Sequence, residues 1–366
     1  MSVQPISAEE VLKVYDRFDA IIDARSEGEH ALDHLPGALN WPSLNNEERI
    51  RVGTLYKQVS PFEAQKIGAS LVAANIARHI EAHVLDKPRH WQPLIYCWRG
   101  GKRSNSLALV LGQIGFKVHL VEGGYKAFRR ALVQDTDAQV QRLQYRVLCG
   151  PTGSGKTRLL QALAEAGAQV IDLEGLACHR ASVLGVIPGQ IQPSQKAFES
   201  RLWDALRRCD PSRPVYVEAE SRKVGNLAVP EALMQRMRQS PCIRLALPTP
   251  ERVRLLMQDY DYFVQDIPLF NERLERLIDL RGKAVVQGWQ TRAQGGEVSA
   301  VVQELLALHY DPGYEASTRR NFSQFEHAQV LELSEADPGS LSHAARQLMA
   351  NDSVLDPLDA GTVGMP

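Results

Sequence analysis

The segment that most constrains the fold of this chain is the glycine-rich stretch at residues 150–157, GPTGSGKT. It fits the pattern G-x-x-x-x-G-K-[ST] at every position, and it lies between a short apolar run and a stretch with the pattern of a helix. The glycines allow successive backbone N–H groups to converge on an anion, and the N-terminus of the following helix adds a favourable dipole. We therefore expect an α/β domain with a phosphate-binding loop formed by Gly150, Gly153, Ser154, Gly155, Lys156 and Thr157.

The acidic side chains that accompany this loop depart from the usual pattern. Such loops generally work with an aspartate that follows a later apolar strand and holds a metal ion. Here glutamates follow the predicted strand 215–217, and further acidic side chains follow the predicted strand 170–173. The departure argues against an ordinary ATPase, because a diphosphate carried on another group would suit the same amides. The candidates for a metal or diphosphate site, with Mg²⁺ as the candidate ion, are Asp172, Glu174, Glu218 and Glu220.

A second anion-binding loop is predicted around Cys97. Residues 94–96 have the pattern of a short buried strand and residues 104–114 that of a helix, so the segment between them leads to a helix N-terminus. Converging N–H groups, the helix dipole and nearby cations all favour a thiolate over a thiol, which makes the sulfur nucleophilic. The other four cysteines have no comparable setting. We predict that Cys97 is catalytic within an anion loop of Arg99, Gly100, Gly101, Lys102, Arg103 and Ser104.

Alternating strand and helix patterns indicate two parallel-sheet α/β domains. In the first, a strand at 18–23 is followed by a helix that begins at Ser60 and Pro61 and runs to about His83. In the second, a strand at 328–333 precedes a helix that runs to Met349. The predicted division is a first domain at 1–130, a linker at 131–145, a phosphate-loop domain at 146–335 with a helical region at about 250–310, and a C-terminal helix with a disordered tail at 336–366.

Cysteine content and hydropathy narrow the class of protein. No run approaches the roughly 18 apolar residues that span a bilayer, and the first residues lack the basic and apolar segments of a secretory signal. The five cysteines are scattered and form no C-x-x-C pair, which argues against a disulfide framework or a zinc site. This pattern is typical of a reducing compartment, so we expect a cytoplasmic protein.

The charge of the chain is unevenly distributed. The net charge of −1 does not by itself indicate a nucleic-acid partner. Residues 191–254, however, carry 12 basic and 7 acidic side chains. A modest basic face is compatible with binding to a phosphate backbone, although a mixed solvated surface has the same composition.

Several motifs in the first half resemble those of rhodanese domains. Asp23-Ala-Arg25-Ser26, then Glu29 and HLPGALNWP at 34–42, are similar to their N-terminal signature. Cys97 lies where these domains carry sulfur, and VEGGY at 121–125 resembles their late glycine turn. The C-x5-R spacing from Cys97 is one residue longer than in the common rhodanese loop. It is similar to that of rhodanese-fold phosphatases, whose wider loop holds a tetrahedral phosphate, although Tyr96 stands where those enzymes usually have a histidine.

The order of the two domains is distinctive. A rhodanese-like domain followed directly by a phosphate-loop domain, with CWRGGKRS at 97–104 and DLEGLACHR at 172–180, resembles the bacterial tRNA 2-selenouridine synthase family over about residues 5–335. The resemblance implies a transferase that acts on the wobble 2-thiouridine of tRNA. It implies S-alkylation by geranyl diphosphate, then replacement of the geranylthio group by selenium from selenophosphate. Both compounds are co-substrates, and no organic prosthetic group is expected.

The same resemblance implies the partners. They are the anticodon region of tRNA and, as a further candidate, a selenophosphate-supplying enzyme, with no membrane partner. Residues 201–254 are the candidate tRNA face, and the candidate RNA or diphosphate contacts are His179, Arg180, Arg222 and Lys223. Aromatic side chains that could stack on an unpaired base, although such residues commonly lie in a core, are Trp203, Tyr216, Tyr260 and Tyr262. A pocket for the geranyl chain is required, and the sequence does not place it.

Two other functions fit the residues, because a fold alone does not fix an activity. One is a sulfurtransferase or persulfide carrier with a regulatory nucleotide-binding domain, which would act on thiosulfate without tRNA. The other is a rhodanese-fold phosphatase fused to a kinase-like domain, in which Cys97 would govern phosphate release and Lys156 would govern ATP turnover.

Overall fold

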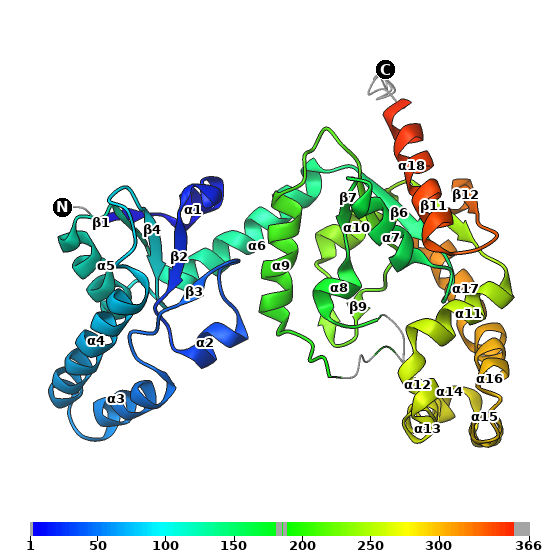
Figure 1. Ribbon diagram of the computed structural model, residues 1–366, viewed down its shortest axis with the longest axis horizontal. Coiled ribbons are helices and arrows are strands. Elements are labelled where there is room, and N and C mark those ends of the chain that lie inside the picture. Colours follow the sequence, from blue (N-terminus) through cyan, green and yellow to red (C-terminus); the bar gives the residue numbers. More distant parts are fainter. Residues whose placement is uncertain (1–2, 181–184, 186–188, 355–366) are drawn as a thin grey trace, which may run out of the picture. The chain divides into compact units, whose positions relative to one another are not determined.

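The computed structural model describes residues 3–180, 185 and 189–354, and the chain divides into two compact units (Figure 1). The first unit comprises Met1–Gln139 and Pro193–Asp204, and the second comprises Val140–Gln192 and Ala205–Pro366. The helix α6 (Gly124–Arg142) covers most of the predicted linker. Residues 193–204, which the sequence assigned to the second domain, belong to the first unit instead. The reason is that Trp203 lies in the core of that unit.

The first unit is built on a five-stranded parallel sheet in the order β1-β5-β4-β2-β3. The middle strand of this sheet, β4, is buried along its whole length, because both faces of the sheet are covered by helices. One face packs against α1 and α6, and the other packs against α4 and α5. The strands are β1 (Val3–Ile6), β2 (Ala20–Asp23), β3 (Leu39–Asn40), β4 (Pro93–Tyr96) and β5 (Val118–Val121).

The helices of the first unit begin with the expected caps. Ser60 accepts hydrogen bonds from the N–H groups of Phe62 and Glu63, and Pro61 occupies the first turn, so the predicted helix from 61 to His83 is confirmed. The sequence did not predict the helix that packs beside it, α3. The helices are α1 (Ala8–Lys13), α2 (Glu27–Leu32), α3 (Asn46–Gln58), α4 (Pro61–His83), α5 (Lys102–Ile114) and α6 (Gly124–Arg142).

The second unit contains another five-stranded parallel sheet, in the order β12-β11-β6-β8-β7, and a small antiparallel hairpin. The strand that leads into the phosphate loop, β6, lies at the centre of this sheet, between β11 and β8. The strands are β6 (Tyr145–Cys149), β7 (Gln169–Ile171), β8 (Val215–Glu218), β9 (Lys223–Val224), β10 (Leu227–Ala228), β11 (Cys242–Ala246) and β12 (Gln329–Glu332).

Helices cover this sheet and extend beyond it. The helix after the phosphate loop, α7, packs beside the C-terminal helix α18 in one apolar cluster with the sheet. The last helix continues to Val354, beyond the predicted Met349, and residues 355–366 of the predicted tail lie outside the described residues. These helices are α7 (Lys156–Glu165), α8 (Leu173–Ala177), α10 (Glu231–Gln239) and α18 (Pro338–Val354). Between α8 and α10 the chain also forms α9 (Gln195–Arg207), whose residues up to Asp204 belong to the first unit.

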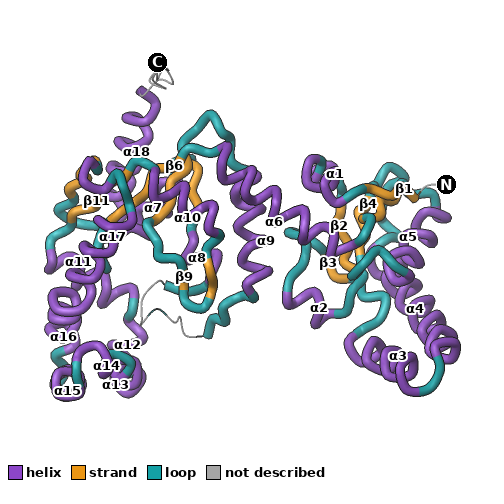
Figure 2. Tube along the Cα trace, turned by 180° about the vertical axis from the view of Figure 1, so that it is seen from behind, coloured by secondary structure: helices purple, strands orange, loops and turns teal. Residues whose placement is uncertain are grey.

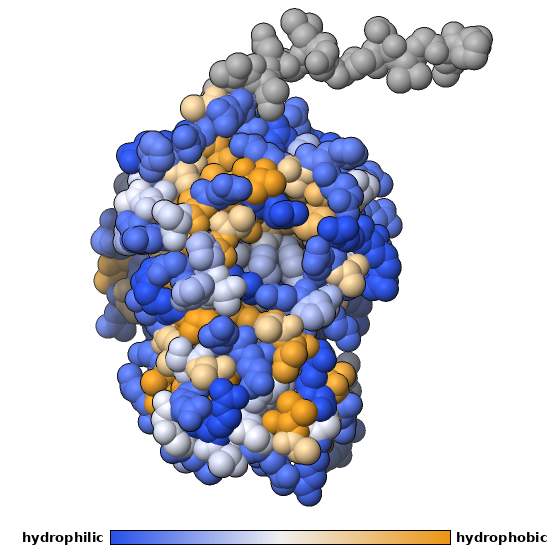
Figure 3. All heavy atoms as spheres, turned by 90° about the vertical axis from the view of Figure 1, so that its right-hand side faces the viewer, coloured by the Kyte–Doolittle hydropathy of each residue, from blue (hydrophilic) through white to orange (hydrophobic). Residues whose placement is uncertain are grey.

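A helical region follows β11, as the sequence predicted for residues 250–310, and it has an apolar core of its own. It gathers at one end of the second unit (Figure 2). From the side on which α15 and α16 lie, separate apolar patches are visible among polar side chains (Figure 3). Its helices are α11 (Thr249–Asp259), α12 (Asp261–Gln265), α13 (Ile267–Glu275), α14 (Ile278–Arg281), α15 (Lys283–Gln294), α16 (Val298–Leu305), a π-helical turn (Leu306–Tyr310) and α17 (Asp311–Asn321).

Within the described part of the chain, no helix combines the length and the apolar character that a membrane crossing requires.

Candidate functional sites

The phosphate loop connects β6 to α7, as predicted. Gly153 and Gly155 adopt φ angles of +76° and +86°, a conformation that side chains with a Cβ rarely take. The ammonium group of Lys156 donates a hydrogen bond to the carbonyl of Gly150 at 2.6 Å. The hydroxyl of Ser154 is buried and has no hydrogen-bond partner among the described residues. The loop therefore has a lysine and an unsatisfied hydroxyl available for an anion.

The loop is held against the helical region by Arg252. Its guanidinium donates two hydrogen bonds to the carbonyl of Thr152, at 2.7 and 3.0 Å, and pairs with Asp311 at 2.6 Å. A Cβ at Gly153 would lie 2.9 Å from Leu256, so α11 packs tightly against the loop. Arg252 is 5% exposed and therefore braces the loop rather than forming part of a tRNA-facing surface, as its place in residues 201–254 had suggested.

Three of the four predicted acidic residues lie together at the start of α7. Carboxylate oxygens of Glu174, Glu218 and Glu220 lie within 4.8 Å of one another. The hydroxyl of Thr157 donates to Glu174 at 3.2 Å and to Glu218 at 3.3 Å. Glu218 at the end of β8 thus occupies the place in which the usual pattern has an aspartate. Oxygen ligands of this kind suit Mg²⁺, so the donor set fits a divalent cation.

Burial and mutual repulsion shift the ionisation of this cluster. Burial, with the neighbouring carboxylates of Glu174 and Glu220, raises the pKa of Glu218 well above its ordinary value. Burial and Glu174 likewise raise the pKa of Glu220 to about 8. Carboxylates this close cannot all ionise without a compensating positive charge. The cluster therefore carries protons or binds a cation.

The fourth predicted acidic residue, Asp172, caps a helix. Its side chain accepts a hydrogen bond from the N–H of Gly175 at 2.7 Å and caps the N-terminus of α8. Capping satisfies one of the free N–H groups of the first helical turn. Asp172 lies outside the group of three carboxylates that could hold one ion, but its charge contributes to the raised pKa of Glu218 and of Glu220, so its place in the metal or diphosphate site stays a prediction.

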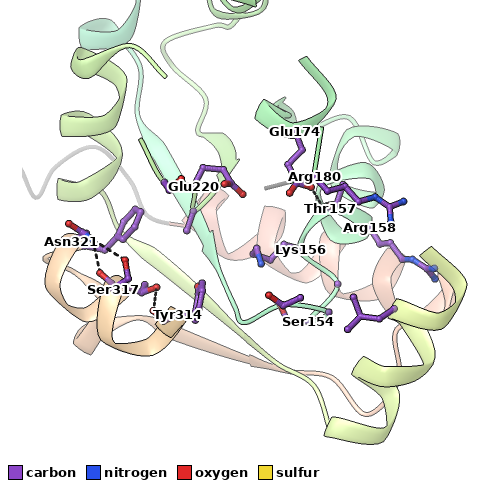
Figure 4. Close-up of a pocket in the computed structure, with 18 of the residues that line it drawn as sticks. Ser154, Lys156, Thr157, Arg158, Glu174, Arg180, Glu220, Tyr314, Ser317 and Asn321 are labelled. Atoms are coloured by element: carbon purple, nitrogen blue, oxygen red, sulfur yellow. Dashed lines mark hydrogen bonds between the residues drawn. The ribbon is translucent and has the colours of Figure 1, made fainter. Parts of the chain in front are cut away.

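A cavity of about 780 Å³ opens over the phosphate loop. Lys156 points into its middle, with Glu174 and Glu220 on one side and Ser154 and Tyr314 on the other (Figure 4). Its lining includes three acidic side chains, Glu174, Glu220 and Asp259. It also includes six basic side chains, and this excess suits a polyanionic ligand. The basic residues are Lys156, Arg158, Arg180, Arg222, Arg238 and Arg320.

Part of the cavity wall was not predicted from the sequence. Tyr314, Ser317, Arg320 and Asn321 all come from α17. They lie far from the loop in sequence, and no motif links the two segments. The one local signal is the pair of arginines at the end of this helix, Arg319 and Arg320.

The four predicted RNA or diphosphate contacts separate into two pairs. Arg180 and Arg222 line the cavity, and the guanidinium of Arg180 lies 4.4 Å from the ring centroid of Tyr260. His179 and Lys223 are not part of the lining. His179 is 8% exposed, and burial lowers its pKa, which disfavours the charged form that would contact phosphate.

Two of the predicted base-stacking aromatics are core residues. Trp203 packs between Tyr15 and Phe128 in the first unit, and its indole N–H donates to Asp135 at 2.7 Å. Tyr216 is 1% exposed, within β8. Neither side chain can reach an RNA base, so the stacking prediction is wrong for both. Tyr260 lines the cavity and Tyr262 is half-buried beside it, so Tyr260 is the better placed of the remaining two.

The Cys97 loop joins β4 to α5, as predicted. The sulfur accepts hydrogen bonds from the N–H of Gly101 at 3.2 Å and from the hydroxyl of Ser104 at 3.0 Å. Donors of this kind stabilise a thiolate or a persulfide. Cys97 is 3% exposed and also contacts an apolar cluster, so a ligand reaches the sulfur only if loop side chains move.

The late glycine turn closes on this loop. The carbonyl of Cys97 accepts a hydrogen bond from the N–H of Tyr125 at 2.8 Å. A Cβ at Gly124 would lie 2.2 Å from that carbonyl and 2.5 Å from the nitrogen of Gly100. The turn at the start of α6 therefore fixes the backbone of the cysteine loop.

The cations of the cysteine loop are not equivalent. Arg99 and Lys102 are exposed. Arg103 is 22% exposed and pairs with Glu29 at 2.7 Å, a carboxylate that also completes a capping box with Ser26. Arg99 and Lys102 are therefore the better candidates for contact with an anion, and Arg103 fixes the loop to α2.

The N-terminal signature forms a buried network behind the loop. Arg25 contacts both carboxylate oxygens of Asp23 and lies over the ring of Tyr125, 4.1 Å from its centroid. Burial alone would raise the pKa of Asp23, but hydrogen bonds from His30 and Arg25 lower it below its ordinary value. The signature thus supports the turn that holds the cysteine loop rather than contacting a substrate.

Comparisons with known proteins agree with this architecture. The family model for a rhodanese-like domain matches residues 7–131, and the model for the AAA domain of tRNA 2-selenouridine synthase matches residues 143–267. The curated relatives named tRNA 2-selenouridine synthase include one from Marinobacter nauticus, which is 36% identical over 81% of this chain and 87% of its own. One from Sulfurovum sp. is 32% identical over 83% of this chain and 90% of its own. The chain therefore belongs to the tRNA 2-selenouridine synthase family.

Proposed function

We propose that this tRNA-modifying transferase converts a wobble 2-thiouridine to 2-selenouridine in two reactions, each at one of its two anion sites. In the first, the sulfur of 2-thiouridine bonds to C1 of geranyl diphosphate while the C1–O bond breaks and diphosphate leaves. In the second, the selenium of selenophosphate bonds to C2 of the nucleobase while the C2–S bond breaks and geranylthiol leaves, and water then cleaves the Se–P bond and releases phosphate. Family membership supports the overall conversion, and the two anion sites support its division into two steps.

The phosphate loop suits the first reaction because negative charge grows on the diphosphate as the C1–O bond breaks. Lys156, the loop N–H groups and the hydroxyl of Ser154 would stabilise that charge, and such stabilisation in the transition state lowers the barrier. Thr157, Glu174 and Glu218 would hold Mg²⁺, which neutralises phosphate oxygens when it is bound. The reaction needs no phosphoryl transfer, so a glutamate in place of the usual aspartate is compatible with it.

The basic cavity around the loop would hold tRNA beside the diphosphate. Arg158, Arg222 and Arg320 line it and would contact the phosphate backbone. Tyr260 offers an aromatic face for a base lifted out of its stack, the way in which single-stranded RNA is usually recognised.

The Cys97 loop suits the second reaction because selenophosphate is a tetrahedral anion. The N–H of Gly101 and the hydroxyl of Ser104 already point at the sulfur, and Arg99 and Lys102 add positive charge at the loop. These groups would bind selenophosphate or stabilise selenium carried on Cys97. On this account the protein works in the cytoplasm and receives selenophosphate from the enzyme that makes it.

The observation that carries the proposal is the cavity that joins the phosphate loop to six basic side chains and a cluster of carboxylates. The test is reconstitution with the purified full chain, a tRNA that carries wobble 2-thiouridine, geranyl diphosphate, selenophosphate and Mg²⁺, followed by mass spectrometry of the nucleosides. We expect S-geranyl-2-thiouridine without selenophosphate and 2-selenouridine with it.

Other outcomes would support the alternatives. Sulfur transfer from thiosulfate to cyanide without any change in tRNA would indicate a sulfurtransferase. ATP turnover that depends on Lys156, together with phosphate release that depends on Cys97, would indicate a kinase–phosphatase pair. Either result without tRNA modification would overturn the proposal.

A further inference from the structure

A narrow apolar recess lies in the helical region of the second unit, beside the phosphate loop. Its walls come from α11, α12, α13, α16 and the π-helical turn. Among the described residues, those that line it carry no charge, and the deepest part is formed by Phe263, Phe270, Leu305 and Leu306, each no more than 4% exposed. A recess of this composition binds hydrocarbon and has little to offer a sugar, a nucleobase or a phosphate.

The recess and the phosphate-loop cavity share part of their walls. Thr152, Leu256 and Tyr260 line both. Thr152 belongs to the phosphate loop itself, and Leu256 packs against Gly153 of that loop. A ligand whose charged end contacts the loop can therefore extend an apolar end into the recess without leaving the protein.

We infer that this recess holds the hydrocarbon chain of an isoprenoid diphosphate whose head group binds in the phosphate loop. The inference rests on the proposed function and adds the location of the chain. A nucleotide would place a polar base and sugar beyond its phosphates, whereas the recess beside this loop is apolar. The pairing of a diphosphate site with a hydrocarbon site selects an amphiphilic substrate.

The recess must widen to hold a ten-carbon chain. Its volume is about 50 Å³, so a ten-carbon chain enters only as side chains at the rim move. The rim is suited to such movement, since Val264 is 37% exposed and Met257 is half-buried, and methionine adapts easily to a new neighbour. Leu306 and Tyr310 lie in the π-helical turn, an irregularity that is frequent at functional sites.

A second apolar groove is the rival location. It has a volume of about 860 Å³ in the first unit, between α3, α4 and α5, and it borders Lys102 and Arg103. Its lining comes from residues of the first unit and includes no residue of the phosphate loop or of the carboxylate cluster.

The test is calorimetric binding of geranyl diphosphate and of inorganic diphosphate to the full chain with Mg²⁺. We expect geranyl diphosphate to bind about 100-fold more tightly, since each buried methylene adds to affinity. Val302, which is half-buried in the wall of the recess, is changed to Phe to fill it. The Val302→Phe variant should lose about tenfold or more of that preference and bind inorganic diphosphate as the wild type does, which also shows that the loop is folded.

Two control variants test whether the hydrocarbon chain of the ligand binds in the recess or elsewhere. Val285→Phe adds the same bulk at a position that is 42% exposed on α15 and outside the recess, and it should retain the full preference. Ala73→Phe fills the groove of the first unit and should retain it as well. Equal affinity of the wild type for both diphosphates would overturn the inference. So would a preference that survives in Val302→Phe and is lost in Ala73→Phe.

The binding test is separable from the proposed function. If Val302→Phe abolishes the preference but the wild type does not alkylate tRNA, the recess holds the chain and the proposed function fails. If the wild type alkylates tRNA and Val302→Phe does so with an unchanged KM for geranyl diphosphate, the proposed function stands and the recess is excluded.

Discussion

At the scale of single residues, the place of Cys97 in a loop between a strand and a helix was predictable and its packing was not. A cysteine between a buried strand and the start of a helix is expected in the loop that joins them. The residues around Cys97 in the sequence were therefore enough to place it there. The contact of Gly124 with the carbonyl of Cys97 depends on how β5 and β4 lie in the sheet. No local pattern contains that information.

Replacing Gly124 by Ala should displace the cysteine loop. The added Cβ would meet the carbonyl of Cys97 at 2.2 Å, and φ is +59°. We expect the free energy of unfolding to fall by about 1–3 kcal/mol. Selenium incorporation should fall more than geranylation, as measured by nucleoside mass spectrometry. Gly115→Ala is the matched control, because its φ is also positive, at +117°, while its Cβ would meet open space. If Gly124→Ala and Gly115→Ala lose selenium incorporation equally, the contact between Gly124 and Cys97 does not hold the cysteine loop in place.

The carboxylate cluster predicts how stability depends on pH. Because burial and Glu174 raise the pKa of Glu220 to about 8, the folded state binds more protons than the unfolded state between about pH 4.5 and pH 8. The free energy of unfolding should therefore decrease as pH rises through this range, when a chelator removes divalent cations. Urea denaturation at several pH values would measure the slope. Glu220→Gln should flatten it, and an unchanged slope would argue against the raised pKa.

At the scale of elements, the helices and strands with strong local patterns were predicted well. The phosphate loop, its flanking β6 and α7, and the helix that begins at Ser60 follow from motifs and caps. Trp203 and Tyr216 lie in the core, which was the alternative that the sequence left open for them. The predicted strand at 215–217 favoured burial of Tyr216, whereas Trp203 in its basic stretch carries no local sign of burial. Asp172 shows a related limit, since an aspartate before a helix can be a ligand, a cap or both, and the sequence alone does not distinguish these roles.

The link between the helical region and the phosphate loop can be tested at Arg252. Its removal leaves the carbonyl of Thr152 and the carboxylate of Asp311 without their shared donor. Arg252→Ala should lower the free energy of unfolding by about 1–3 kcal/mol. It should also weaken binding of inorganic diphosphate about tenfold, which corresponds to the same range of energies. Arg254→Ala removes an exposed arginine paired with Glu251 on the same helix and should have little effect. If Arg252→Ala binds inorganic diphosphate as tightly as the wild type does, Arg252 does not brace the phosphate loop.

At the scale of the whole molecule, the net charge gives no indication of the basic cavity over the phosphate loop. A net charge of −1 gives no reason to expect RNA, yet the cavity over the phosphate loop has twice as many basic as acidic side chains. The division into two units was visible in the order of motifs. The assignment of residues 193–204 to the first unit was not, because it depends on where Trp203 packs.

The tRNA-binding role of the cavity can be tested with two neighbouring arginines. Arg320 lines the cavity, whereas Arg319 pairs with Glu315 and Glu326 and is not part of the lining. Arg320→Gln should weaken tRNA binding and reduce the slope of log affinity against log salt by about 1. Arg319→Gln should leave the slope unchanged. Binding of tRNA with equal salt dependence in the two variants would place the RNA elsewhere.

The most direct test of two separate anion sites is the wobble nucleoside found in tRNA from cells whose only copy of the protein is Lys156→Ala or Cys97→Ser. The account predicts that Lys156→Ala leaves unmodified 2-thiouridine, and that Cys97→Ser accumulates S-geranyl-2-thiouridine without 2-selenouridine. Normal geranylation by Lys156→Ala, or full selenium incorporation by Cys97→Ser, would contradict it.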